Sequence, residues 1–266
     1  MKKVFLIAIT IVFALTSLIG CSKGGESNNV IRIGVSPRPH RELIELIEED
    51  LEKEGIKLEI TEFDDYIKPN LALSENELDA NFFQHEPYMN NFKEENNIDI
   101  TSIGGVHIEP MGLYSSKYKS IDELENNSEI AIPNDPTNGG RALLLLEKYG
   151  LIKLKEDAGI LATENDVVEN PKNLKLTALE AAYLPRVLNE VDGAVINGNY
   201  ALEADLIPTE DAIILEEKDS PYANIIAIRS GEENEERFIK LMEVLQSDKV
   251  RKFIEENYHG GVIPAF

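Results

Sequence analysis

The chain has few of the residues that covalent and metal chemistry use. Its 266 residues include one cysteine, Cys21, which excludes a disulfide within the chain. The four histidines, His40, His85, His107 and His259, stand far apart in the sequence. None of them forms the HxH or HxxxH pair that is typical of zinc sites. We therefore expect no metal site and no cofactor.

Positive charge is also scarce. The 26 lysines and arginines face 49 aspartates and glutamates, and the net charge is −23. Such a surface opposes binding to nucleic acid, because basic patches supply most of that affinity. The sequence also has no G-x-S-x-G elbow, P-loop or dinucleotide fingerprint. We expect no enzyme, although His85 beside Glu86 keeps acid–base chemistry open as an alternative.

The N-terminus has the pattern of a secretory signal. Two lysines precede an almost wholly apolar stretch, residues 4–19. This stretch is shorter than the roughly 20 residues that a membrane-spanning helix needs. The stretch leads into L-I-G-C, which resembles the lipobox whose cysteine receives diacylglycerol in bacterial lipoproteins. We expect loss of residues 1–20, lipidation of Cys21 and a flexible tether over residues 21–29. An ordinary signal peptide with a chance cysteine is the alternative.

Strand and helix patterns alternate in two later stretches. In the first stretch we predict two strands, a short apolar one at 30–35 and one with alternating apolar and polar residues at 56–63. An amphipathic helix lies between them and ends before Gly55. This βαβ order predicts a parallel sheet. The second stretch and the C-terminal region contain further predicted elements: strands at 129–133, 192–196 and 223–228, and helices at 141–149, 177–188 and 238–256. The second of these helices is predicted from a capping box formed by Thr177 and Glu180.

This order favours an α/β protein with two lobes, each a mixed sheet flanked by helices. The expected crossings lie near residues 104–112 and 219–224. The first lobe would then comprise residues 30–108 and 224–266, and the second lobe, residues 109–223, would be an insertion.

Four polar or aromatic clusters lie close to predicted strands: residues 64–70, 79–88, 133–143 and 196–201. Ligands of parallel α/β sheets bind at the carboxyl ends of strands, where such loops gather. Arg141, expected in the first turn of a helix, would add a guanidinium to free backbone N–H groups. That combination suits a carboxylate or a phosphate. An Arg141 that only forms a structural salt bridge within the protein is an equally good interpretation.

The other cluster residues offer two further kinds of contact. Aromatic rings could form a wall for an apolar or thioether side chain, since sulfur packs favourably against ring edges; these are Tyr66, Phe83, His85 and Tyr88. Asparagine carbonyls could accept hydrogen bonds from an ammonium group; these are Asn197, Asn199 and Asn224. Core packing and turn formation are the alternatives.

Taken together, these segments resemble the NlpA/MetQ family of methionine-binding lipoproteins. The similarity rests on DYIKPNLAL, LDANFFQHEPYM, IPNDPTNGGRALLLLEKYGLI, INGNYAL and SPYANIIAIR, which occur in the family's order. It implies a two-lobed fold like that of periplasmic (type II) binding proteins. It also implies an extracytoplasmic, lipid-anchored receptor of an ABC importer, with a permease and an ATPase as partners.

The resemblance further implies a set of ligand contacts. Arg141 would bind the carboxylate of methionine, and Asn138, Asn197 and Asn224 would orient its backbone. Tyr66, Phe83, His85 and Tyr88 would enclose the thioether. Alternative ligands are a methionine-containing dipeptide or another amino acid. Alternative functions are a lipoprotein enzyme or a surface adhesin.

Overall fold

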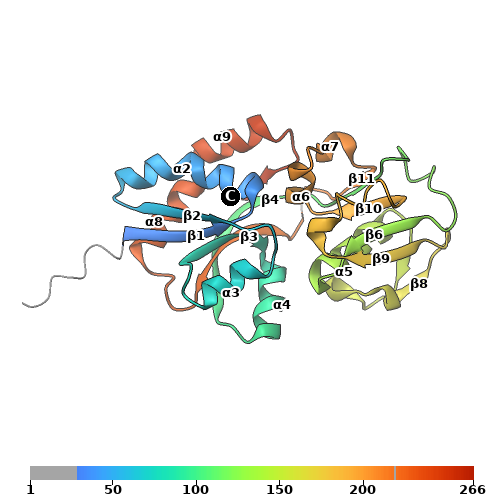
Figure 1. The fold of residues 1–266 in the computed structure, drawn as a ribbon, viewed down its shortest axis with the longest axis horizontal. Coiled ribbons are helices and arrows are strands. Elements are labelled where there is room, and N and C mark those ends of the chain that lie inside the picture. Colours follow the sequence, from blue (N-terminus) through green and yellow to red (C-terminus); the bar gives the residue numbers. More distant parts are fainter. Residues whose placement is uncertain (1–28, 219) are drawn as a thin grey trace, which may run out of the picture.

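The computed structural model describes residues 29–218 and 220–266. The expected signal, Cys21 and the tether up to residue 28 lie outside the described residues. Two sheets lie side by side with helices around each, so the protein is a two-lobed α/β fold (Figure 1). No helix in the described part of the chain is both long and apolar enough to cross a membrane.

The first lobe is built on a six-stranded mixed sheet in the order β13-β4-β12-β3-β1-β2. Its strands are β1 (Val30–Val35), β2 (Lys57–Glu62), β3 (Ala80–His85), β4 (Ile100–Ile108), β12 (Ala223–Arg229) and β13 (Ile263–Pro264). β1 runs parallel to β2 and β3, as the βαβ pattern predicts, whereas β12 is antiparallel to both β3 and β4.

Helices cover both faces of this sheet. They are a short π-helical segment (Pro37–Arg41), α2 (Glu42–Lys53), α3 (Lys68–Ser74), α4 (Glu86–Asn96), α8 (Glu236–Leu245) and α9 (Asp248–Asn257). The apolar stripe of α2 shares one core with α8 and α9, and its Leu43, Ile44, Ile47 and Leu51 are fully buried. Each such side chain contributes about 1.5–3 kcal/mol through its burial. Leu73 of α3 and Met89 of α4 belong to a second core.

The second lobe is built on a five-stranded sheet in the order β11-β5-β10-β6-β9. Its strands are β5 (Gly112–Tyr114), β6 (Glu129–Pro133), β9 (Lys175–Leu179), β10 (Gly193–Ile196) and β11 (Ile214–Leu215), and β7 (Lys153–Leu154) pairs with β8 (Val167–Glu169) beside it. The helices are α5 (Pro136–Lys148), α6 (Gly198–Glu203) and α7 (Pro208–Asp211), with 3-10 turns at Gly159–Leu161, Glu164–Asp166 and Ala181–Tyr183.

The predicted helix over residues 177–188 is wrong. Residues 175–179 form the edge strand β9, which pairs in parallel with β6, and Thr177 uses its hydroxyl to bond Glu129 Oε1 at 2.8 Å. The spacing of Thr177 and Glu180 matches a capping box by chance. The alternating K-L-T-A-L pattern suits a strand, and pairing with β6 decides the outcome.

Two other helices differ in their bounds. The helix expected from Arg141 begins five residues earlier, at Pro136, because Asp135 caps it and accepts a hydrogen bond from the N–H of Asn138 at 2.9 Å. The helix expected over residues 238–256 is two helices, α8 and α9. Ser247 has extended backbone angles between them, and its hydroxyl caps α9. The apolar stripe continues through both because they pack against the same core.

The chain passes between the lobes twice. The first connection, residues 109–111, joins β4 to β5, and the second joins β11 to β12 between Leu215 and Ala223. The backbone N–H of Met111 in the first connection donates to Glu216 Oε2 in the second at 3.0 Å. The two connections therefore lie next to each other.

Candidate ligand-binding site

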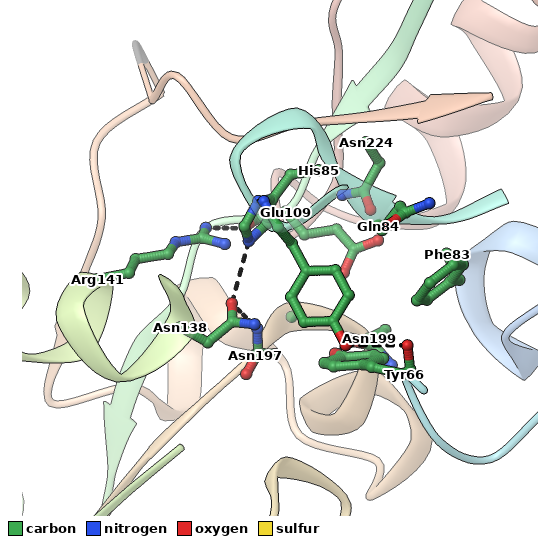
Figure 2. A pocket seen from close by; sticks show the side chains of 12 residues that line it. Tyr66, Phe83, Gln84, His85, Glu109, Asn138, Arg141, Asn197, Asn199 and Asn224 are labelled. Atoms are coloured by element: carbon green, nitrogen blue, oxygen red, sulfur yellow. Dashed lines mark hydrogen bonds between the residues drawn. The ribbon is translucent and has the colours of Figure 1, made fainter. Parts of the chain in front are cut away.

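A pocket lies between the lobes, and twelve residues line it (Figure 2). From the first lobe come Tyr66, Phe83, Gln84, His85, Tyr88 and Asn224, and from the second come Asn138, Arg141, Gly198, Asn197 and Asn199. Glu109 belongs to the first connection. The structure thus brings together all eight residues that the sequence predicts as ligand contacts. Asn224 belongs to β12 of the first lobe, whereas Arg141 belongs to α5 of the second.

The first turns of α5 carry two of these residues into the pocket. Gly139 and Gly140 precede Arg141, and a Cβ atom on Gly140 would lie 2.2 Å from the carbonyl oxygen of Ile160. No side chain fits there, so the glycine allows α5 to lie against the 3-10 turn that contains Ile160. This close packing sets the positions of Asn138 and Arg141.

His85 is a neutral hydrogen-bond donor in this pocket. The backbone N–H of Tyr88 donates to its Nδ1 at 3.1 Å, so the ring proton is on Nε2. Nε2 then donates to Asn138 Oδ1 at 3.1 Å. Burial, together with the charge of Arg141, lowers the pKa of His85 to about 3. This hydrogen bond joins β3 of the first lobe to α5 of the second.

Asn138 is the centre of an amide network. Its Nδ2 donates to both carboxylate oxygens of Asp135, at 3.1 and 3.0 Å, which fixes the orientation of the amide. Its Oδ1 accepts from His85 and also from Asn197 Nδ2 at 2.8 Å. Asn197 Oδ1 is buried and has no hydrogen-bond partner among the described residues. A buried acceptor of this kind costs about 1–3 kcal/mol unless a ligand or water satisfies it.

Three rings form an aromatic wall on the first-lobe side. The centroids of Tyr66 and Phe83 and those of Tyr66 and Tyr88 are each 5.9 Å apart, and Phe83 lies 6.1 Å from Tyr88. Tyr66 also reaches across to the second lobe, where its hydroxyl donates to Asn199 Oδ1 at 2.5 Å. Burial raises the pKa of Tyr66 well above its usual value, so this hydroxyl remains a donor.

Arg141 lies deeper in the fold than the sequence predicts. It is the sixth residue of α5 and not part of the first turn. The free backbone N–H groups at the start of the helix therefore do not form an anion-binding site together with its guanidinium. Nε and Nη2 bind the carboxylate of Glu216, and Nη2 also donates to the carbonyl oxygen of Glu109 at 2.8 Å. The guanidinium lies 4.2 Å from the ring centroid of Tyr222. Nη1 has no hydrogen bond among the described residues.

His40 and His107, which are far apart in the sequence, lie close together in the fold. Their ring centroids are 5.0 Å apart, and the side chains of both converge on Glu109. His107 Nε2 lies 2.7 Å from Glu109 Oε1, and His40 Nε2 lies 3.4 Å from the same atom and 3.1 Å from Asn224 Oδ1. Residues far apart in sequence come together here because β4 and the π-helical segment meet at one end of the sheet.

This cluster has the residue types of a metal site but not the proton arrangement. The Nδ1 atoms of His40 and His107 are buried and have no hydrogen-bond partner in the described part of the chain. A metal on Nε2 would place a proton on Nδ1, where ligating histidines almost always have an acceptor. We therefore assign the protons to Nε2, where Glu109 and Asn224 accept them.

Sequence reasoning missed part of the lining. Gln84, Glu109 and Gly198 are pocket residues that we did not select, and Asn199 was considered only as a possible acceptor. The signal for Glu109 is present in V-H-I-E-P-M-G-L, where one carboxylate interrupts an apolar run. The signal for Gly198 is visible only in three dimensions, because a Cβ atom there would lie 2.6 Å from the Cβ of Glu109.

Comparison with known proteins agrees with this architecture. The model of the NlpA lipoprotein family matches residues 31–266. The chain belongs to the NlpA lipoprotein family. Family relatives include the D-methionine-binding lipoprotein MetQ of Salmonella typhimurium, which is 42% identical over 250 residues, 93% of this chain and 92% of the relative. The membrane lipoprotein TpN32 of Treponema pallidum is 41% identical, over 90% of this chain and 89% of its own.

Solved structures of NlpA-type lipoproteins and related receptors share the fold. A nutrient-binding protein from Burkholderia cenocepacia, solved bound to methionine, is 45% identical with a TM-score of 0.86, covering 89% of this chain and all of the other. The methionine-binding protein MetQ is 42% identical with a TM-score of 0.87, covering 90% of this chain and 99% of the other.

Proposed function

We propose that this chain captures methionine between its two lobes and delivers it to the membrane permease of an ABC importer. The observation that carries this proposal is the pocket, in which Arg141, an asparagine network and an aromatic wall converge from both lobes. A guanidinium suits a carboxylate, and aromatic rings suit a thioether. The 45% identity to a nutrient-binding protein solved with methionine supports the same ligand.

Each group of lining residues has a proposed role. Arg141 binds the ligand carboxylate, and Asn138, Asn197 and Asn224 orient the amino-acid backbone. The thioether is enclosed by Tyr66, Phe83, His85 and Tyr88. Burial of a methionine-sized side chain contributes roughly 1.5–3 kcal/mol, so the remaining affinity comes from the charged groups of the ligand.

Delivery depends on closure of the lobes. We propose that residues 30–108 and 224–266 move as one lobe and residues 109–223 as the other. The hydrogen bonds from His85 to Asn138 and from Tyr66 to Asn199 connect the two lobes in the closed form. Ligand shifts the equilibrium toward closure only through a higher affinity for the closed form. The permease and its ATPase would then respond to that closed form.

The proposed role includes no catalysis. His85 is the histidine of the pocket lining, and both of its ring nitrogens are already in hydrogen bonds. With a pKa lowered to about 3, it is a poor base near neutral pH. The acid–base alternative raised by His85 and Glu86 therefore has no support in this geometry.

We further propose that the receptor is held on the extracytoplasmic face of the membrane by lipid on Cys21. Membership of a lipoprotein family supports this location. A diacyl modification supplies at least two chains, as stable anchoring requires. The anchor would raise the effective concentration of captured ligand at the transporter.

Isothermal titration calorimetry with L-methionine, D-methionine, a methionine-containing dipeptide and L-leucine tests the proposed ligand. We expect saturable 1:1 binding of L-methionine and roughly tenfold weaker binding of leucine, because sulfur–ring contacts contribute up to about 1.5 kcal/mol. If the dipeptide binds more tightly than L-methionine, the ligand is a peptide and not the free amino acid. No saturable binding of any of the four would refute the proposed function.

A further inference from the structure

The chain contains the sequence Asn-Gly twice, at Asn138-Gly139 and at Asn197-Gly198. An asparagine before glycine can deamidate without an enzyme, because the glycine nitrogen reaches the asparagine side chain with no Cβ atom in its way. Both asparagines line the pocket. Because the two dipeptides are identical in sequence, their surroundings in the fold decide which of them reacts.

Asn138-Gly139 is protected by helix α5. The N–H of Gly139 donates to the carbonyl oxygen of Asp135 at 2.8 Å, so its nitrogen is engaged. The side-chain amide of Asn138 is held at both ends, by the carboxylate of Asp135 and by His85. Ring closure here would break the first turn of α5 as well as these hydrogen bonds.

Asn197-Gly198 lacks that protection. Asn197 precedes α6 with extended backbone angles, and Gly198 is the first residue of the helix, where an N–H has no partner within the helix. The N–H of Gly198 has no other hydrogen bond among the described residues either. The Asn197 amide is held by one hydrogen bond, from Nδ2 to Asn138 Oδ1, and its Oδ1 has no partner in the described part of the chain. Ring closure here costs the hydrogen bond from the N–H of Ala201 to the Asn197 carbonyl and leaves the rest of α6 in place.

The carboxylate of Glu109 lies beside this backbone. A Cβ atom on Gly198 would lie 3.2 Å from Glu109 Oε2, and the backbone N–H of Asn199 also interacts with Glu109. Burial raises the pKa of Glu109, which makes its carboxylate a stronger base than an exposed one. A base next to the N–H of Gly198 would accept its proton as the nitrogen attacks.

We propose that Asn197 is a site of spontaneous deamidation and that Glu109 is the base that assists it. The nitrogen of Gly198 bonds to the side-chain carbonyl carbon of Asn197, and its proton passes to Glu109. The bond from that carbon to Nδ2 then breaks, and ammonia leaves with the proton that Glu109 returns. Water opens the resulting succinimide at either of its carbonyl groups, which leaves aspartate or isoaspartate at position 197. One water is consumed, one ammonia is released, and Glu109 is restored.

Deamidation would damage the ligand site. The new carboxylate has no N–H to donate to Asn138 Oδ1, and it adds a negative charge to the pocket that contains Glu109. This consequence rests on the proposed function: methionine binding should be lost as Asn197 converts. Calorimetry of the aged protein should show the fraction of binding-competent protein falling in step with conversion. A binding fraction that stays constant while Asn197 converts would refute this consequence, whereas fresh protein that binds no methionine would refute the proposed function instead.

Peptide mapping by mass spectrometry tests the assignment on the purified protein, incubated at pH 8 and sampled over days. We expect Asn197 to convert at least about threefold faster than Asn138, since reaction at Gly139 must first break a hydrogen bond. The same protein unfolded in urea is the matched control, and both Asn-Gly sequences should convert at similar rates there. No conversion of Asn197 in the folded protein, or conversion no faster than that of Asn138, would overturn the proposal.

Two variants test the role of Glu109. E109Q removes the base, whereas E217Q removes a carboxylate on a side chain that is 73% exposed. We expect E109Q to slow the conversion of Asn197 by about tenfold or more and to leave that of Asn138 unchanged. E217Q should match the wild type at both sites. An E109Q protein that remains folded by circular dichroism and converts Asn197 at the wild-type rate would show that Glu109 is not the base.

Discussion

Arg141 and Glu216 form a forked ion pair, in which Nε lies 2.8 Å from Oε1 and Nη2 lies 2.5 Å from Oε2. Arg141 belongs to α5, and Glu216 belongs to the second connection between the lobes. Because Glu216 also accepts from the N–H of Met111, the pair ties α5 to both connections. Arg141 therefore has a structural role in addition to its proposed role at the ligand carboxylate.

Replacing Arg141 should consequently affect both binding and stability. In R141A the Glu216 carboxylate, which is only 12% exposed, loses its partner. We expect calorimetry to detect no methionine binding and urea unfolding to show a loss of about 3 kcal/mol or more. The sequence did not reveal this effect on stability, because the ion pair joins residues that are 75 positions apart.

The double variant R141M/E216Q separates these two effects. It removes both charges, so no buried charge is left without a partner. We expect it to recover much of the stability lost in R141A, as measured by the same urea unfolding, without recovering methionine binding. Recovery of binding in the double variant would show that Arg141 does not bind the ligand.

The hydrogen bond from Tyr66 to Asn199 should contribute to affinity through closure. Y66F keeps the ring of the aromatic wall and removes the hydroxyl that reaches the second lobe. We expect methionine affinity to fall by about three- to tenfold, in line with a net hydrogen-bond contribution of about 0.5–1.5 kcal/mol. Y149F is the control, because the Tyr149 hydroxyl donates to Leu215 within the second lobe. Equal loss of affinity in both variants would argue against a closing contact at Tyr66.

His85 should make stability depend on pH. Its pKa is lowered to about 3 in the folded protein, whereas an unfolded histidine has its usual pKa near 6.5. The unfolded state therefore gains a proton between these values and the folded state does not. The free energy of unfolding should fall by about 1.4 kcal/mol per pH unit from this residue as the pH drops below 6.5.

The variant H85Q isolates this contribution, since glutamine can still donate to Asn138. The raised pKa values of Glu109 and Asp135 act in the opposite direction, but these groups are present in both proteins and cancel in the difference. Urea unfolding between pH 4.5 and 7.5 should show the advantage of wild type over H85Q shrinking with acid. A difference that does not change with pH would contradict a neutral His85.

Removal of the lipid site should release the protein from the membrane. In C21A no thioether can form at position 21, so we expect the protein to leave the detergent phase and the membrane fraction. Methionine affinity of the purified variant should equal that of the wild type, because the pocket lies within residues 66–224. Continued membrane association of C21A would point to an uncleaved signal as the anchor.

Sequence patterns predicted the parts of the fold that depend on local periodicity. β1, β2 and α2 lie where alternation and the apolar stripe indicate, and the eight predicted contacts all line one pocket. Most of them lie at or after the carboxyl ends of β2, β3, β6 and β10, as expected for ligand sites of α/β sheets. Asn224 instead lies at the amino end of β12, which is antiparallel to β3. Their individual roles stay predictions until binding is measured.

The errors arose where tertiary contacts outweigh local signals. Pairing with β6 turned the expected helix at residue 177 into a strand. The cluster of His40, His107 and Glu109 depends on elements that meet only in the folded chain, so spacing in the sequence could not reveal it. The partnership of Arg141 with Glu216, 75 residues away, has the same origin.

The central claim, that this pocket takes methionine, is tested most directly by native mass spectrometry of the purified protein before and after addition of L-methionine. Binding proteins with buried ligands often retain them, and our account predicts a mass increment of one methionine in at least one of the two spectra. The R141A variant should show none. A wild-type protein that neither retains nor takes up methionine, while its pocket remains folded by circular dichroism and thermal unfolding, would contradict the account.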